Sequence, residues 1–426
     1  MEHSHLLRQD AETNFKAQYK TRTNWSRGSC RVKEVEVGLP SELPLLAKVS
    51  QGMVYTVDST HGLRAWSHTF TPKLLATQPF MSTESIPTCF AVDASNRGAH
   101  VTVGFGDGHF GVWTFELAQG FLPLCDHSAS SDGDLVSMAL AMPYVLTMCG
   151  KKILRLYRVL SDATEEVAGR LVEELASLRS EISYAPCSLS IRQSPKTVIA
   201  SIAYSFSRLN AGWCIGLQEL RLTKEGQILN SRVVSTVDTP LILCPPPKSP
   251  FKISSRSASS RPFPLHPDSM DRPKSLSYCH PYLLAALGDS TLMVYLVTSD
   301  GEKLDISTGR RLFGHTNGVC AAEVSDRGKA VSVSRQGKEI RVWDLEEALT
   351  TFSQRKESTR IIPITQLDRY EAAVARLAQF LRTKIESSSK DSELASIQNW
   401  VGFDDEQVVI LGDRDTKQIL SCYDFT

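Results

Sequence analysis

Short runs in which apolar and polar residues alternate recur along the whole chain, and turns rich in Gly, Asp or Ser separate them. Val331 and Val333 belong to one such run, and Ile340 and Val342 belong to the next. A period of two places every second side chain on the same face of a β-strand. The pattern therefore predicts an all-β chain of short antiparallel strands joined by tight turns.

The clearest repeat unit is LFGHTNGVCAAEVSDRGKAVSVSRQGKEIRVWDLEEA, with Gly314 and His315 near its start and Trp343 and Asp344 at its end. This unit resembles a WD repeat, which folds as a four-stranded blade. The resemblance implies that His315 is a structural residue that forms a hydrogen bond inside the blade, rather than a metal ligand or a base.

The turn that follows the second strand of this unit departs from the repeat. An Asp normally stands in that turn and orients the His, whereas this sequence has Arg335-Gln336-Gly337. We therefore expect the internal hydrogen-bond network to be incomplete even in this blade.

Weaker copies of the unit are found by the aromatic or apolar end of the third strand. Those strands end at or near Trp66, Trp113, Tyr157, the hairpin of residues 213–222, Tyr295 and Tyr423-Asp424. Together with the Trp343 unit they make seven copies, so we expect a seven-bladed WD-repeat-type β-propeller over residues 30–426.

The last copy stops after its third strand, at Thr426. The segment Arg31 to Gly38 alternates Val32, Val35 and Val37 with charged residues. We expect it to pair with the last strand and close the ring, because pairing removes two exposed sheet edges.

Three insertions interrupt the repeats. Residues 245–275 are rich in Pro, Ser and basic residues, which predicts a disordered loop. Residues 365–387 have apolar residues at helical spacing, which predicts a helix between the sixth and seventh blades. The apolar positions around residues 175–178 fit either a helix or a strand, and we favour an outer strand.

Composition limits the choice of partners and compartment. Lys plus Arg equals Asp plus Glu at 47 each, so no net basic field favours nucleic acid or a membrane surface. The longest uncharged run is too short to span a bilayer, and the start of the chain lacks a secretory signal. Ten scattered cysteines are typical of reduced thiols, so we expect a cytoplasmic or nuclear protein, or one found in both compartments.

Catalytic motifs are missing from the sequence: there is no nucleophile elbow, no H-E-x-x-H and no P-loop. GDGHFG, residues 106–111, matches a dinucleotide-binding string, but a strand-like run follows it instead of a helix, so we interpret it as a hairpin turn. We therefore expect no enzymatic activity, no metal and no cofactor.

Residues 1–29 form a basic leader that contains Tyr19, Asn24-Trp25 and Gly28. This leader resembles the junction between the F-box and the propeller in fungal-type F-box/WD-repeat proteins. In that family the F-box binds a Skp-type adaptor of a cullin-RING ubiquitin ligase, and the propeller binds a protein substrate. Only about sixteen polar residues precede Ala17, so we expect the F-box, and with it the adaptor and cullin contact, to lie outside this chain.

The resemblance also implies where a substrate binds. In relatives whose substrates are phosphorylated, basic side chains near the central channel pair with phosphate. The corresponding turns here contain Lys151, Lys152, Arg335, Lys338 and Arg414. The alternative is that these are ordinary solvated turn residues, and that the propeller is a scaffold for complex assembly or trafficking with no role in ubiquitin transfer.

Overall fold

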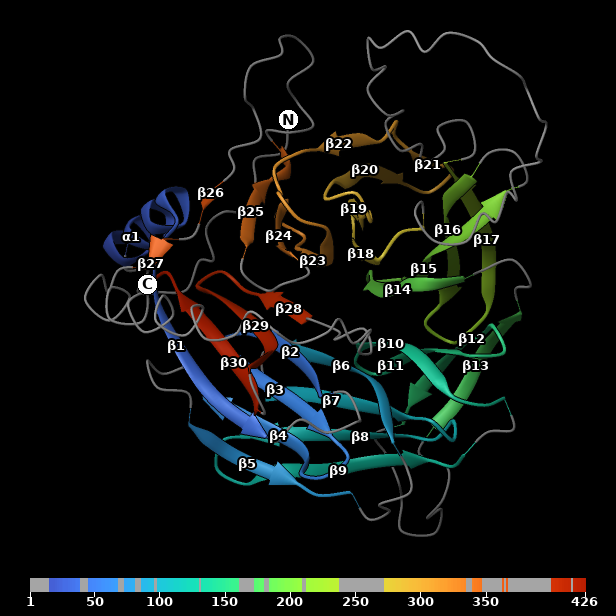
Figure 1. The fold of residues 1–426 in the computed structure, drawn as a ribbon. Coiled ribbons are helices and arrows are strands. Elements are labelled where there is room, and N and C mark those ends of the chain that lie inside the picture. The colour runs from blue at the N-terminus through green and yellow to red at the C-terminus, as the bar shows by residue number, and fades with distance from the viewer. Residues whose placement is uncertain are drawn as a thin grey trace, which may run out of the picture.

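In the computed structural model, the alternating segments form seven sheets arranged as a ring (Figure 1). The structure describes residues 15–38, 45–67, 73–80, 86–95, 98–129, 132–160, 172–179, 184–208, 212–236, 272–334, 339–346, 362–363, 365–366, 400–414 and 417–426. Within these residues the expected seven-bladed, all-β propeller is confirmed.

The first four blades each contain four antiparallel strands in chain order from the centre outwards. Blade 1 comprises β2 (Leu46–Ser50), β3 (Met53–Asp58), β4 (Gly62–Ser67) and β5 (Leu74–Gln78). Blade 2 comprises β6 (Pro87–Ser95), β7 (Gly98–Phe105), β8 (Phe110–Glu116) and β9 (Gly120–His127). Blade 3 comprises β10 (Leu135–Ala141), β11 (Tyr144–Cys149), β12 (Ile153–Val159) and β13 (Val172–Arg179). Blade 4 comprises β14 (Tyr184–Gln193), β15 (Thr197–Arg208), β16 (Gly212–Thr223) and β17 (Ile228–Ser235).

The remaining blades vary this plan. Blade 5 comprises β18 (Ser275–Cys279), β19 (Tyr282–Ala286), β20 (Leu292–Ser299) and two short strands, β21 (Leu304–Ile306) and β22 (Arg310–Leu312), which both pair with β20. Blade 6 comprises β23 (Val319–Val324), β24 (Lys329–Ser334), β25 (Ile340–Asp344) and β26 (Ile362–Pro363). Blade 7 comprises β28 (Trp400–Phe403), β29 (Gln407–Arg414), β30 (Lys417–Asp424) and β1 (Ser29–Gly38), with β27 (Thr365–Gln366) alongside β1.

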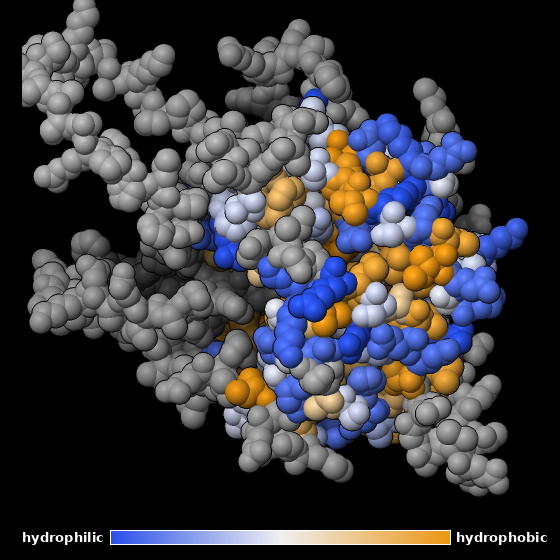
Figure 2. Space-filling model, turned by 90° about the vertical axis from the view of Figure 1, so that its right-hand side faces the viewer, coloured by the Kyte–Doolittle hydropathy of each residue, from blue (hydrophilic) through white to orange (hydrophobic). Residues whose placement is uncertain are grey.

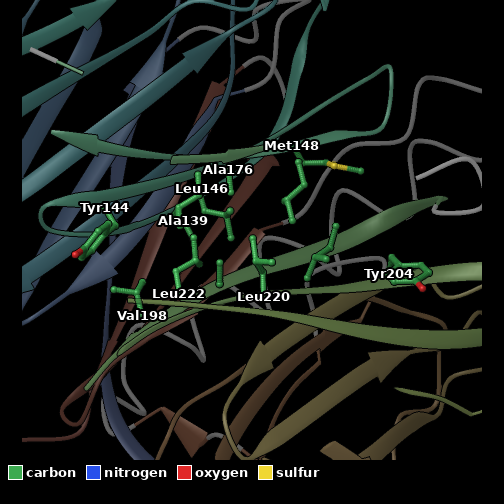
Figure 3. Packing of buried hydrophobic residues seen from close by; sticks show 13 residues of the cluster. Ala139, Tyr144, Leu146, Met148, Ala176, Val198, Tyr204, Leu220 and Leu222 are labelled. Atoms are coloured by element: carbon green, nitrogen blue, oxygen red, sulfur yellow. The ribbon is translucent and has the colours of Figure 1, made fainter. Parts of the chain in front are cut away.

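Apolar side chains fill each space between neighbouring blades. Seven separate buried clusters are found among the described residues, one at each of the seven blade interfaces. Figure 3 shows the cluster between blades 3 and 4, where Leu146 and Met148 of β11 face Val198, Leu220 and Leu222 of blade 4. Because both faces of each blade are buried against neighbouring blades, packing between blades stabilises the ring.

The N-terminal strand closes the ring, as the sequence predicts. β1 runs antiparallel to β30 from Arg31 opposite Asp424 to Gly38 opposite Gln418. The guanidinium of Arg31 forms an ion pair with the Asp424 carboxylate at 2.6 Å. Blade 7 therefore joins the two ends of the described chain in one sheet.

A buried arginine connects this closing strand to blade 1. Arg64 Nη1 of β4 donates to the carbonyl of Val37 in β1 at 2.7 Å, and Arg64 Nη2 pairs with Asp58 at 2.6 Å. Burial lowers the pKa of Arg64, and the neighbouring Asp58 carboxylate opposes that change. The guanidinium therefore satisfies a backbone carbonyl across the blade boundary while its charge is balanced within blade 1.

The three expected insertions have different outcomes. The outer strand near residues 175–178 is present as part of β13. Most of the predicted loop 245–275 lies outside the described residues, but Ser275 already belongs to β18, so the strand begins inside the predicted range. Residues 365 and 366 form β27, which pairs with β1, and the rest of the predicted helix 365–387 lies outside the described residues.

Deletion of residues 1–38 is expected to destabilise the whole ring, whereas deletion of residues 1–28 should leave the closing strand in place. Loss of β1 uncovers the edge of β30 and removes three valines from their packing, which corresponds to on the order of 4 kcal/mol or more. Urea unfolding and size-exclusion chromatography would measure both effects. Equal stability and equal oligomeric state for the two truncated chains would refute a closing role for β1.

Candidate protein-binding surfaces

The two faces of the ring carry different sets of turns. The turns between first and second strands gather on one face, where they are joined by side-chain to backbone hydrogen bonds such as Gln51 Nε2 to Ala94 O at 2.7 Å and Gly52 N to Asp404 Oδ2 at 2.9 Å. The turns between second and third strands lie at the opposite ends of the strands, on a face that we call the turn face. Loops from several blades thus meet on one rigid surface, which is the usual arrangement of a propeller binding site.

Lys151 and Lys152 lie on the turn face, in the turn between β11 and β12. Lys152 has a left-handed backbone, with φ of 62°. Beside this turn is a shallow pocket between blades 2 and 3, whose lining includes Asp132, Arg155 and Tyr157. Arg155 forms an ion pair with Asp132, so the Lys pair stands next to a guanidinium whose charge is already balanced.

The side chains of the other three predicted basic residues lie outside the described part of the structure. Arg335 and Lys338 lie outside the described residues. Arg414 is the last residue of β29, so its backbone is at the turn face, but its side chain is outside the described part. Of the five candidates, the described structure brings together Lys151 and Lys152.

Aromatic residues line the same pocket region, and sequence analysis missed them. The ring of Phe110 stacks on His127 with centroids 4.8 Å apart, and Tyr157 lies 5.2 Å from Phe110. Burial raises the pKa of Tyr157, which keeps its phenol neutral. These residues belong to three different strands of two blades, so no local spacing in the sequence identifies them as neighbours.

His315 lies in a buried hydrogen-bond network in blade 6. Trp343 Nε1 donates to Ser332 Oγ at 2.8 Å, and Ser332 Oγ lies 2.6 Å from His315 Nε2. Because the indole can only donate, Ser332 accepts from it and donates its own proton to Nε2. The imidazole proton is then on Nδ1, and burial lowers the pKa of His315. Its contacts make His315 a structural residue of the blade.

Glu339 faces His315 in place of the missing turn aspartate. Its Oε2 lies 3.4 Å from His315 Nδ1, which is within ion-pair distance, although Nδ1 has no hydrogen-bond partner. The same carboxylate accepts from the backbone and hydroxyl of Thr316 and pairs with Arg341. Partial burial raises the pKa of Glu339, but these hydrogen bonds outweigh it and lower the pKa to about 2.

The other predicted repeat residues, Trp66, Trp113 and Asp344, differ in their surroundings. Trp66 Nε1 donates to Thr56 Oγ1 at 2.9 Å, which fixes the indole within blade 1. Trp113 packs near Phe80, with centroids 6.1 Å apart. Asp344 is exposed at the end of β25.

The leader contains a helix that the sequence reasoning did not predict, α1 (Phe15–Arg27). Trp25 is 3% exposed and stacks on Phe425 with centroids 4.0 Å apart. Trp25 Nε1 donates to the carbonyl of Asp405, and Asn24 Nδ2 donates to that of Phe425, both at 2.8 Å. Gly28 ends the helix with a left-handed φ of 67°. The Asn-Trp pair therefore anchors α1 on blade 7.

Outer strands add exposed apolar surface at the rim of the ring. On β17, Ile228, Leu229 and Val233 are more than half exposed. Figure 2 shows the side of the molecule that includes blade 4, where apolar patches alternate with charged residues. Edge strands with few charges are common sites of contact with other chains.

Chemical groups that could support other functions have unreactive environments in the described residues. No group of three or more His, Cys, Asp or Glu residues there could hold a metal ion. No described helix has the length and apolar character needed to cross a bilayer. The nine described cysteines are free, and burial raises the pKa of several of them, for example that of Cys89 to about 12. Such thiols are poor nucleophiles.

Replacement of the anchoring tryptophan is expected to destabilise the protein. Trp25→Ala should cost about 3–5 kcal/mol, because it leaves a cavity between blades 6 and 7 and unpairs a carbonyl. Tyr19→Ala on the exposed side of the same helix is the control and should change stability by less than about 0.5 kcal/mol. Urea unfolding measures both. Equal losses for the two variants would show that α1 is not anchored through Trp25.

The low pKa of Glu339 predicts a pH-dependent contribution to stability. A carboxyl whose pKa is depressed from 4.5 to about 2 in the folded state stabilises the protein above pH 4.5, and this contribution is lost as the pH falls toward 2. Glu339→Gln should therefore be less stable than the parent at neutral pH, and the difference should shrink in acid. Thermal unfolding across that pH range measures it, with the exposed Glu302→Gln as control. A constant difference at every pH would contradict the network.

Comparison with known proteins gives one family match. The family model described as "F-box protein pof12 beta-propeller" matches residues 30–426, and no F-box domain is detected in the chain. No curated protein matches the chain.

Solved structures with a similar chain trace include the computationally designed Ika8 protein, at 15% identity and TM-score 0.41 over 88% of this chain and 81% of that one. They also include the WD40 beta propeller domain of Doa1, at 11% identity and TM-score 0.44 over 92% of this chain and 96% of that one. The family match spans nearly the whole described ring, from the closing strand to the last residue. The chain belongs to the F-box protein pof12 beta-propeller family.

Proposed function

We propose that this chain is the substrate-binding part of an F-box-type subunit of a cullin-RING ubiquitin ligase. The observation that carries the proposal is the family match over residues 30–426, together with a ring of blades whose described turns between second and third strands share one face. In this role the propeller binds a protein substrate, and a Skp-type adaptor and cullin are recruited through an F-box outside this chain.

Lys151 and Lys152 are the residues that we assign to substrate contact. They stand on the turn face, in a turn beside the Asp132–Arg155 ion pair. Two adjacent ammonium groups suit an acidic or phosphorylated segment, because charge-assisted hydrogen bonds to carboxylate or phosphate are stronger than neutral ones.

The proposed role involves binding rather than chemistry. We propose that the propeller is not an enzyme and that it acts in the cytoplasm or nucleus, which agrees with described cysteines that are all free. The alternative is a scaffold for complex assembly or trafficking. The exposed apolar outer strand β17 favours that alternative, because it offers a contact area that substrate binding on the turn face does not use.

Affinity purification of the full-length protein from its native cells tests the proposal, with mass spectrometry of the bound proteins. We expect a Skp-type adaptor and a cullin in amounts comparable to the bait. We also expect one or more substrates that are lost from a Lys151→Glu/Lys152→Glu variant while the adaptor is retained, since reversal of charge at a rim contact weakens association.

A matched charge change on the other face is the control. Lys196 and Lys224 lie in turns at the opposite ends of the strands, and a Lys196→Glu/Lys224→Glu variant should retain both substrate and adaptor. Absence of adaptor and cullin from every sample would overturn the ligase role and favour the scaffold. Presence of the adaptor with substrates unaffected by the Lys151 and Lys152 changes would overturn the assignment of the turn face.

A further inference from the structure

The outer side of α1 exposes two aromatic residues. Phe15 is 67% exposed and Tyr19 is 73% exposed. They are four residues apart, so they lie on the same side of the helix, one turn from each other. The inner side, with Asn24 and Trp25, is held against blade 7. Large aromatics at such exposure are unusual on a surface with no partner, since burial of each ring in an interface is favourable.

The charge on the same helix has one sign. Its ionisable residues are Lys16, Lys20, Arg22 and Arg27, and it contains no acidic residue. All four are exposed to solvent. The complete chain is neutral, with 47 basic and 47 acidic residues, so α1 concentrates positive charge that the rest of the molecule does not share. Lys16 and Lys20 directly follow the two aromatics in the helix, and together they make a surface that matches an acidic partner with an apolar depression.

The helix is a rigid support for this surface. Its C-terminal end is fixed by the stacking of Trp25 on Phe425 at 4.0 Å and by the cation of Lys329, which lies 5.2 Å from the centre of the Trp25 ring. Gly28 then directs the chain into β1. A helix that is already ordered loses little conformational freedom on binding, so the entropic cost of forming the complex is small.

We propose that the outer face of α1, formed by Phe15, Lys16, Tyr19 and Lys20, is a docking surface for a second protein whose own surface is acidic around an apolar pocket. A protein fits better than a membrane, because the largest aromatic residue of the helix, Trp25, is buried in the propeller and only two aromatics remain to insert. This proposal goes beyond the substrate-binding role and holds equally for a scaffold.

The position of α1 permits two partners at once. Trp25 Nε1 contacts the carbonyl of Asp405, in the turn between β28 and β29, which is a turn between first and second strands. The helix thus lies at the face opposite to Lys151 and Lys152. A protein on α1 and a protein on the turn face would be bound on opposite sides of one rigid ring.

Site-specific photocrosslinking of the full-length protein tests the proposal. A photoreactive benzoylphenylalanine replaces Tyr19 in one protein and Lys196 in the control, and crosslinked peptides are mapped by mass spectrometry after irradiation in native extract. At position 19 we expect adducts with an acid-rich segment of another protein. We expect about tenfold fewer adducts when Lys16→Glu and Lys20→Glu are added, and fewer at high salt. The control position should give none of these adducts.

Three results would overturn the proposal. They are adducts only within the same chain, adducts with a segment that is not acidic, and adducts whose yield is unchanged by Lys16→Glu/Lys20→Glu. Unchanged melting temperatures of all variants verify that α1 remains anchored. Cosedimentation with phosphatidylserine vesicles and gel shift with duplex DNA complete the test. Binding to either probe that depends on Phe15 and Tyr19 would replace the protein partner with a lipid or nucleic-acid partner.

Discussion

The pairing of β1 with β30 is the interaction on which the rest of the structure depends. Each blade buries both of its faces against its neighbours, so a ring with one incomplete blade leaves two apolar faces and a sheet edge exposed to water. β1 supplies the outer strand of the last blade, and Arg64 of blade 1 reaches across to its Val37 carbonyl. The closing strand is therefore bound on both sides of the boundary between the last and the first blade.

The same closure determines where the leader helix lies. α1 ends at Gly28, one residue before β1 begins, so the helix must emerge beside blade 7. Trp25 then fills the gap between blades 6 and 7, where it packs with Val331, Val342 and Phe425. The anchoring of α1 is thus coupled to the closure of the ring. A partner bound to the helix would be held in a fixed orientation relative to the propeller.

The two proposed binding surfaces of this neutral chain are both basic, and they differ in shape. On the turn face, Arg155 pairs with Asp132, and Lys151 and Lys152 lie in the neighbouring turn. On α1 no acidic residue balances four cations. In the two proposals both surfaces bind acidic partners, but the first lies in a turn between two strands of a blade and the second is a convex helix. The two proposed partners would therefore have to match surfaces of different shape.

The alternation of apolar residues predicted the strands and the closing strand, because a period of two reports burial of a strand directly. The seven blades were predicted by counting copies of the unit that resembles a WD repeat. The WD unit likewise identified His315 and Trp343 as members of a blade. The sequence did not indicate that Glu339 would stand beside His315, nor that Phe110, His127 and Tyr157 would meet. Those contacts join strands that come together only when the blades fold and pack.

The leader shows most clearly which features the sequence predicted and which depended on the tertiary structure. Its resemblance to the junction in F-box/WD-repeat proteins marked Asn24, Trp25 and Gly28, while the short, strongly polar segment gave no sign of a stable helix. Isolated helices of this length are marginal in water, and α1 is stabilised by docking of Trp25 on a surface that the closed ring creates. The sequence by itself determined the repeating blades, whose signal is local. Only the tertiary structure decided the helix, the face it exposes and the grouping of charged and aromatic side chains, because those depend on contacts between residues far apart in the chain.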